Sequence, residues 1–556
     1  MESSDTQIIR YVEDNVLDQK YKQYPFFYRQ SDITIPYLLK ILGGLDRSID
    51  TIEEGISLYR RRSIIQNILN AISHSLRWIS KSEGQVLLPP TYGKQIEEEA
   101  MEALGWGVSY AMLVQDHVAF SRDELIGKVD VNNKTISFEH RVDFDPFILL
   151  TQAASEELHT ASIFDLLPIK ELGKEFNPWV KRFASRLSVT NTDWQIKSDE
   201  TSYQAVLSWI NQIVWPELPS SLDLGGYSLD DYRRLVASIY LHGLFFSWLE
   251  DYIDDRYDTD QEANSVVIAD TEHGMAMRLS KLSGVPPASI RAILNDLIFD
   301  PTYFHSLITM QPFVRSKNRR IYFLARLIAM LDFSRMLATA VNRKHKRHIY
   351  ERLVNSLEQA NLDIIESKLR SLGFVVLREK RISDSKGAVI TPDFLIFDSQ
   401  SKELVVVDYK HTLAPIGAAE VLTKSNTIKE GKEGFLQLRK YLDFLRNNNS
   451  SLQSLGINVG NLDKLRGILL FRWPMALPVS RTSDVLLTDW VSLSNFLVKG
   501  GKVTLPELFH WVEHRPDLSV NPNVWTPLHH QIEVDDWTYN HLILVQDAHD
   551  SHSTYK

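Results

Sequence analysis

The chain of 556 residues lacks cysteine altogether, which excludes disulfide bonds, thiolate nucleophiles and metal sites built on cysteine ligands. It also lacks a long apolar run. The best candidate for a membrane span, Leu235–Leu249, contains His242 and has 15 residues. Because a bilayer span needs roughly 20 residues, we interpret this segment as a buried helix. The N-terminal sequence MESSDTQIIRYVEDN is polar where a signal peptide needs an apolar core, so we expect a cytoplasmic protein with no membrane partner.

Common catalytic signatures are missing as well. The sequence contains no Walker A loop, no G-x-G-x-x-G and no G-x-S-x-G, so ATP-driven translocation and esterase chemistry lack their usual motifs. The composition is ordinary for globular proteins, with 44% hydrophobic and 24% charged residues, 24 Gly and 21 Pro. At roughly 150 residues per domain, the length predicts about three to four domain equivalents.

Charge is distributed unevenly along the chain. The net charge is −10, from 61 basic and 71 acidic residues, so the whole chain does not have the composition of a nucleic-acid-binding protein. Residues 341–480 contain 22 Lys and Arg against 15 Asp and Glu, a net charge of +7, which leaves −17 for the rest of the chain. This asymmetry predicts one module that faces a polyanion.

The first 345 residues have the periodicity of helices. Apolar residues recur at three- and four-residue spacing over 32–121 and 146–340, which predicts mainly helical domains at residues 1–145 and 146–345. Alternating apolar and polar residues over 127–139 predict a β-hairpin in the first domain. One acidic cluster has a spacing that suits a divalent cation, but a solvated helix face is the simpler interpretation. Its members are Glu250, Asp251, Asp254, Asp255, Asp258 and Asp260.

The pattern changes after residue 345. A helical stripe ends at Gly373, a favourable residue after a helix C-terminus, and strand-like segments follow. The order of helix, three strands, helix and strand predicts an α/β domain at residues 346–480, followed by a C-terminal α/β extension at 481–556. The predicted strands are 374–377, 393–398, 403–408 and 467–471, and the second helix is 435–444.

Acidic and basic residues gather at the ends of two predicted strands. Asp393 begins one strand, and Asp408 and Lys410 end the next. Asp408 and Lys410 share a face because alternate side chains of a strand point the same way. If the two strands pair as a hairpin, both carboxylates and the lysine meet at one point. Carboxylates can hold Mg²⁺, which activates water, while a lysine orients that water or stabilises phosphate charge, so the set predicts phosphodiester hydrolysis.

These residues resemble the motif of the PD-(D/E)xK nuclease superfamily: Pro392-Asp393 with the apolar strand after it, and Asp408-Tyr409-Lys410. The resemblance covers about 130 residues, over 349–480. It implies a restriction-endonuclease-like fold with a central mixed β-sheet, in which the two aspartates and an acid on the preceding helix hold Mg²⁺, with Mn²⁺ as a substitute. For the helix acid we choose Glu366, which borders the apolar stripe. Asp363 and Glu358 stay open as alternatives.

The segment QLRKY at 437–441 resembles the Q-x-x-x-Y element of exonuclease-type and defence-associated branches of this superfamily. Residues four apart share a helix face, so Gln437 and Tyr441 can both reach the site. The resemblance implies that they place substrate or an active-site side chain. The 27 positions from Lys410 to Gln437 suggest an insertion. Its lysines are candidate contacts to a phosphate backbone, namely Lys424, Lys429 and Lys432.

Other patterns compete with this interpretation. His510, Glu513 and His514 match the H-x-x-E-H motif of inverted zinc proteases, which also needs a downstream acid on another helix. Glu533 is the sole glutamate that follows, so we interpret the segment as a surface helix. Basic clusters also occur, and the one that directly precedes the nuclease-like helix is the best placed for contact with a nucleic-acid backbone. The clusters lie at residues 60–62, 315–320 and 343–348.

Together these observations predict a cytoplasmic, Mg²⁺-dependent nuclease, with DNA favoured over RNA because of the resemblance. Cleavage within a strand or from its end stays open. By family analogy we expect an effector of prokaryotic antiviral defence or restriction. The large helical region is expected to bind a partner protein, a nucleic-acid feature or a second copy in a homodimer. The alternative is a catalytically inactive nuclease-like domain that binds nucleic acid or acts as a scaffold through its helices.

Overall fold

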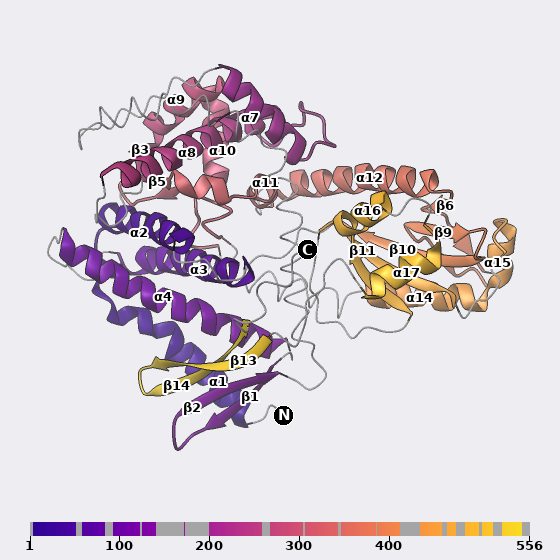
Figure 1. Cartoon of the computed structure of the whole chain (residues 1–556), viewed down its shortest axis with the longest axis horizontal. Coiled ribbons are helices and arrows are strands. Elements are labelled where there is room, and N and C mark those ends of the chain that lie inside the picture. The colour runs from indigo at the N-terminus through magenta and orange to yellow at the C-terminus, as the bar shows by residue number, and fades with distance from the viewer. Residues whose placement is uncertain are drawn as a thin grey trace.

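A mainly helical region and an α/β region make up the protein, and a long helix, α12 (Arg347–Ser371), joins them (Figure 1). In the part of the chain that is described, none of the helices combines the length and the apolar content that a membrane span requires. This computed structural model describes residues 4–51, 58–83, 93–122, 125–140, 172, 200–257, 267–303, 306–342, 346–384, 386–411, 434–458, 464–473, 484–499, 503–514 and 525–546.

Helices of the N-terminal part pack their apolar stripes into one core, as the three- and four-residue spacing predicts. Aromatic side chains pack against one another within and beside this core. The ring of Trp78 stacks on Tyr21 with 5.4 Å between centroids and meets Phe27 edge-on at 5.2 Å. The helical prediction is confirmed for the described residues of 32–121. The elements are α1 (Ser4–Asn15), η1 (Leu17–Gln23), η2 (Pro25–Tyr28), α2 (Ser31–Thr51), α3 (Leu58–Ser82) and α4 (Lys94–Ser121).

The hairpin predicted over 127–139 is confirmed as β1 (Leu125–Asp130) and β2 (Thr135–His140). A second hairpin, from the far end of the chain, extends its sheet: β13 (Trp525–Val534) and β14 (Trp537–Gln546). Strand β14 runs parallel to β2, which gives the order β1-β2-β14-β13 (Figure 1). The Nδ1 atom of His541 lies 2.6 Å from a carboxylate oxygen of Asp116 in α4. The pairing of β14 with β2 thus brings segments about 400 residues apart in the chain into one sheet.

The second half of the helical region contains α7 (Glu200–Ile213), α8 (Leu229–Tyr257), α9 (Glu272–Ser283), α10 (Pro287–Leu297), η3 (Arg326–Met330) and α11 (Phe333–Val341). Residues 235–249 lie within α8, and its apolar residues Leu235, Leu241 and Leu249 are buried as predicted. A small sheet of order β3-β5-β4 was not predicted. Its segment RIYFL has strand-forming residues but is too short for its periodicity to exclude a buried helix. The strands are β3 (Val267–Thr271), β4 (Val314–Arg315) and β5 (Arg320–Leu324).

Helix α12 belongs to two hydrophobic cores at once. Its first half packs in the core of the helical region, and its second half packs against the sheet of the α/β region. Gly373 follows the helix with φ +92°, the left-handed conformation in which glycine is favoured after a helix C-terminus. One continuous helix therefore connects the two regions (Figure 1). Its apolar stripe is Ile349, Leu353 and Leu357 in the first core, and Leu362, Ile365 and Leu369 in the second.

A mixed sheet of order β12-β11-β10-β9-β6 forms the centre of the α/β region. Strands β6, β9 and β10 are antiparallel neighbours, whereas β10, β11 and β12 run parallel. The strands and helices predicted for 346–480 are confirmed, but β12 and a small hairpin of β7 (Ile382–Ser383) and β8 (Val389–Ile390) were not predicted. The sheet strands are β6 (Val375–Arg378), β9 (Phe394–Asp398), β10 (Glu403–Lys410), β11 (Arg466–Phe471) and β12 (Val485–Asp489).

Helices cover both faces of this sheet. On one face lie α12, α16 (Trp490–Lys499) and α17 (Leu505–His514), and on the other lie α14 (Phe435–Asn447) and α15 (Asn449–Ser454). In β10, Val407 and Tyr409 belong to the core under α12, whereas Leu404 and Val406 belong to the core under α14. Asp408 therefore projects toward the α14 face, because side chains alternate along a strand.

The C-terminal extension expected at 481–556 does not form one unit. Its first part, β12 with α16 and α17, completes the sheet of the α/β region, and its last part, β13 and β14, completes the N-terminal sheet. Unpaired strand edges and apolar helix faces are both stabilised by a neighbour, whatever its distance along the chain. The expected boundary at residue 480 is corrected accordingly.

Candidate active site

Asp393 and Asp408 meet at one end of the antiparallel pair β9 and β10. Phe394 is paired with Val407, so the next residues outward, Asp393 and Asp408, are adjacent. The Oδ2 atom of Asp393 accepts a hydrogen bond of 2.6 Å from the backbone N–H of Tyr409. Asp408 is only 3% exposed, and Asp393 is half-buried. The hairpin pairing that the sequence analysis assumed is present, and it brings the two carboxylates together.

Burial and the charge of Asp408 raise the pKa of Asp393 to about 7, compared with 3.8 for a free aspartate. The hydrogen bond from Tyr409 and the charge of Lys410 oppose this rise in pKa, and the charge of Glu358 adds to it. Two neighbouring carboxylates in a site with little water cannot both be charged without a cost. A further cation bound between them would lower that cost.

Lys410 lies beside this pair, with its Nζ atom 3.0 Å from the Oδ2 atom of Asp408. Its side chain is 22% exposed, so the ammonium group stands between the buried carboxylate and solvent. The carbonyl of Lys410 accepts a hydrogen bond of 3.2 Å from the backbone N–H of Arg472, the residue after β11. An ammonium group placed here can stabilise charge on a phosphate oxygen or orient a water molecule.

Gln437 and Tyr441 lie one turn apart on α14, the helix that covers this face of the sheet. The Nε2 atom of Gln437 donates to the hydroxyl of Tyr441 at 2.5 Å, and that hydroxyl donates to the carbonyl of Thr391 at 3.4 Å. Burial raises the pKa of Tyr441, the bond from Gln437 opposes the rise, and the charges of the two aspartates add to it. Because Thr391 lies two residues before Asp393, the pair holds the segment that carries the first carboxylate.

Among the described residues, Glu366 forms its ion pairs away from the two aspartates and Lys410. Its carboxylate pairs with arginines at the corner of α12 and β6, Arg370 at 2.7 Å and Arg378 at 3.6 Å. The exposed Asp363 pairs with Arg378 as well. Glu358, about two turns earlier on α12, is the helix acid whose charge acts on the first aspartate. Of the three acids of α12 considered from the sequence, Glu358 is therefore the one whose charge acts on Asp393, and Glu366 is engaged with arginines.

A polar network on the α12 face of the sheet was not found from the sequence. The hydroxyl of Tyr409 lies 3.3 Å from Nδ1 of His411, and Nδ2 of Asn361 lies 3.5 Å from the same nitrogen. The guanidinium of Arg472 donates to Oδ1 of Asn361 and, at 2.8 Å, to Oε1 of Glu217. Two signals were available: His411 directly follows the Asp-Tyr-Lys segment, and Arg472 directly follows the predicted strand 467–471.

The donor set fits Mg²⁺ or Mn²⁺, since both prefer oxygen ligands. Among the described residues, no group of three or more His, Asp or Glu side chains is arranged to hold a metal ion. Mg²⁺ is commonly bound through one or two carboxylates, with water and substrate phosphate at its other positions. The raised pKa of Asp393 agrees with such a site, because a bound cation would offset the burial of the carboxylate and its repulsion by Asp408, the two main causes of the rise.

Two residues of the other charged clusters are paired within the fold. Lys346, from the third basic cluster, is buried and pairs with Asp296 at 2.6 Å, so it is not available to a phosphate backbone. Asp251, from the acidic cluster, pairs with Arg326 at 3.0 Å. Outside the described residues lie residues 343–345, Asp258, Asp260, Lys424, Lys429 and Lys432, together with the side chains of Asp254, Asp255 and residues 60–62.

The H-x-x-E-H segment forms the exposed end of α17. The rings of His510 and His514 lie 4.2 Å apart between centroids, and Nδ1 of His514 lies 2.9 Å from the carbonyl oxygen of His510. Both rings and Glu513 are exposed, while the apolar side of the helix packs on the sheet. This arrangement agrees with the interpretation of a surface helix.

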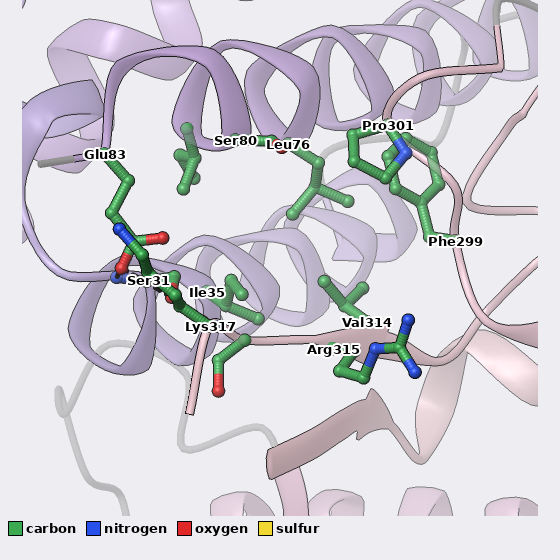
Figure 2. Close-up of a pocket in the computed structure, with 12 residues that line it drawn as sticks. Ser31, Ile35, Leu76, Ser80, Glu83, Phe299, Pro301, Val314, Arg315 and Lys317 are labelled. Atoms are coloured by element: carbon green, nitrogen blue, oxygen red, sulfur yellow. Dashed lines mark hydrogen bonds between the residues drawn. The ribbon is translucent and has the colours of Figure 1, made fainter. Parts of the chain in front are cut away.

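A cavity of about 230 Å³ lies in the helical region, between α2, α3 and the chain around β4. Figure 2 shows Glu83 beside Ser31 at one end and Phe299 at the other. Glu83 accepts hydrogen bonds from the backbone N–H of Ser31 at 3.0 Å and from its hydroxyl at 2.9 Å, so it caps the first turn of α2. Arg315 and Lys317, from the second basic cluster, line the cavity with exposed side chains. The candidate active site does not belong to this cavity.

Comparisons with known protein families, with curated proteins and with solved structures find no significant match to this chain.

Proposed function

We propose that the protein is a metal-dependent nuclease with a restriction-endonuclease-like domain, which hydrolyses phosphodiester bonds at Asp393, Asp408 and Lys410. The meeting of these three side chains at the end of β9 and β10 carries the proposal. The order of strands and helices around the mixed sheet agrees with it. Bound Mg²⁺ or Mn²⁺ would supply an activated water and would neutralise charge on the phosphate.

The proposed roles follow from the positions of the side chains. Asp393 and Asp408 would hold the cation, and the hydrogen bond from the N–H of Tyr409 keeps the first carboxylate beside the second. Lys410 would orient the attacking water or stabilise the developing charge on phosphate oxygens. Tyr441, bonded to the carbonyl of Thr391, would keep the Asp393 segment in place.

We propose DNA as the substrate, because the motif resembles DNA-cleaving members of the superfamily. The net charge of +7 over residues 341–480 supports a polyanionic substrate. Prokaryotic defence or restriction is the proposed context. A homodimer is part of the proposal, since it would place two sites on one duplex and allow both strands to be cut.

A cleavage assay with matched variants tests the proposal. The full chain, Asp408→Ala and Lys410→Ala are incubated with supercoiled plasmid, linear duplex, single-stranded DNA and RNA in Mg²⁺ or Mn²⁺. Lys464→Ala is the control, because Lys464 pairs with Glu403 at the opposite end of β10, at 3.0 Å. Wild type and control should cleave, and the two site variants should be slower by at least about 100-fold.

One pattern of results would contradict this proposal. If the wild type cleaves no substrate with either metal, yet binds nucleic acid as tightly as Asp408→Ala does, the domain is an inactive binding module. The gel also identifies the substrate class, since each nucleic acid is present in a separate lane.

A further inference from the structure

Glu217 of the helical region contacts Arg472, and Arg472 in turn contacts Lys410, the lysine of the proposed nuclease site. Its carboxylate accepts a hydrogen bond of 2.8 Å from the guanidinium of Arg472, and the exposed fractions of the two side chains are 11% and 18%. The backbone N–H of Arg472 donates to the carbonyl of Lys410 at 3.2 Å. Arg472 therefore connects a loop of the helical region to the end of β10.

Hydrogen bonds from α8 hold the loop that carries Glu217. Arg233 of α8 is buried and donates to the carbonyl of Val214 at 2.8 Å and to that of Trp215 at 2.7 Å. Trp215 has φ +45°, a left-handed conformation that a bulky side chain rarely adopts. Charge-assisted bonds to two successive carbonyls stabilise this unusual turn. The position of Glu217 therefore follows that of α8.

Arg472 also contacts α12, the helix shared by the two cores. Its guanidinium donates to Oδ1 of Asn361, which is fully buried, and Nδ2 of Asn361 lies 3.5 Å from Nδ1 of His411. His411 directly follows Lys410 in the chain. Through Arg472, the Glu217 loop, α12 and the end of β10 meet at one point.

Loss of Glu217 would leave the half-buried guanidinium of Arg472 without this carboxylate. A charge removed from water needs its partner, so Arg472 would turn toward solvent and release its bonds on Asn361. The backbone bond from Arg472 to Lys410 would remain, but Asn361 would no longer be held by the guanidinium. Asn361 would then restrain His411, the residue after Lys410, less firmly. Small displacements matter at a catalytic centre, since a shift of about 1 Å can slow a reaction about 100-fold.

We propose that Glu217 is a positioning residue of the nuclease site, which acts through Arg472 on Lys410. The helical region thereby controls the alignment of the catalytic strand, and a partner that moves α8 or its loop would change the cleavage rate. The inference rests on the proposed nuclease function for its consequence, and on the contacts of Glu217 for its structural part.

The test compares Glu217→Ala with Glu99→Ala, which removes a similar carboxylate far from the nuclease site. Glu99 forms two hydrogen bonds of 2.6 Å to Arg29, and its side chain is 17% exposed. The readouts are kcat and KM for plasmid DNA with Mn²⁺, and amide hydrogen exchange over residues 408–411. Glu217→Ala should lower kcat by about tenfold or more, leave KM within about twofold, and speed exchange at the strand end. Glu99→Ala should leave kcat and this exchange unchanged.

Two further variants separate positioning from loss of folding. Glu217→Gln keeps an acceptor for Arg472 and should retain most of kcat, whereas Arg472→Lys should behave like Glu217→Ala because lysine lacks the planar set of donors. Wild-type kcat and exchange in Glu217→Ala would overturn the inference. If the wild type does not cleave DNA, the proposed function fails, and the exchange alone decides the coupling: faster exchange supports it, and unchanged exchange overturns it.

Discussion

The backbone N–H of Tyr409 donates a hydrogen bond of 2.6 Å to the carboxylate of Asp393, which joins β10 to the residue that precedes β9. The same tyrosine packs its ring into the core under α12, on the other face of the sheet. Its hydroxyl lies 3.3 Å from Nδ1 of His411. Tyr409 thus links the acidic pair on one face to the polar network on the other.

The stability of the protein should depend on the proton that Asp393 holds. Its pKa is about 7 in the folded protein and near 3.8 in the unfolded chain, so between these values only the folded state keeps the proton. The free energy of unfolding should therefore fall as the pH rises from about 4 to about 7, and then level off, by at most about 4 kcal/mol. Urea unfolding without divalent cations, at several pH values, measures this. Asp393→Asn should remove that part of the slope, and an unchanged slope would contradict the prediction.

Asp408→Asn should abolish stabilisation by Mn²⁺. A cation that binds only the folded state stabilises it by about 2.7 kcal/mol when its concentration is about 100 times its Kd. The cation also competes with the proton on Asp393. The rise in Tm on adding Mn²⁺ should thus be larger at about pH 8 than at about pH 6. Thermal unfolding with and without Mn²⁺ measures it. Glu403→Gln, at the opposite end of β10, is the control and should keep the rise, whereas an equal rise in Asp408→Asn would place the cation elsewhere.

Tyr441→Phe should slow cleavage, because the hydroxyl of Tyr441 helps to hold the segment that carries Asp393. The hydroxyl of Tyr441 accepts from Gln437 and donates to the carbonyl of Thr391. The substitution removes both bonds, and each such bond contributes about 0.5–1.5 kcal/mol to the free energy of unfolding. We expect kcat to fall by about tenfold, because the segment that carries Asp393 is less well held. The control is Tyr203→Phe. The hydroxyl of Tyr203 donates to the carbonyl of Arg234 at 3.5 Å in the helical region. Equal kcat in both variants would contradict a positioning role.

Lys346→Met should destabilise the start of α12 strongly. Lys346 Nζ lies 2.6 Å from the buried carboxylate of Asp296, which would be left without its cation, at a cost of about 3–5 kcal/mol. Adding Asp296→Asn should restore part of the loss. Lys94→Met is the control, because Lys94 and Glu98 are 89% and 66% exposed, and should change stability by less than about 1 kcal/mol. Urea denaturation measures all variants, and equal effects of the two lysine substitutions would contradict the buried pair.

Local patterns in the sequence predicted the N-terminal hairpin and much of the α/β region. The periods of helices and strands depend on neighbouring residues alone, so the hairpin over 127–139 and the strands around residues 394 and 405 could be predicted. The shared face of Asp408 and Lys410 follows from strand alternation, and the shared face of Gln437 and Tyr441 follows from the helical repeat. These relationships need no knowledge of distant contacts.

Sequence alone therefore determined the N-terminal hairpin, the main strands and helices of residues 346–480, and which of their side chains share a face. Only the tertiary structure decided which turn of α12 faces the acidic end of the sheet, and so that Glu358, in place of Glu366, acts on Asp393. It also decided that Lys346 is buried, that β14 joins β2, and that Glu217 reaches Arg472. The physical reason is that partners distant in the chain decide how a helix is rotated, which strand pairs with a sheet edge and which charge is buried. Local periodicity contains no information on those partners.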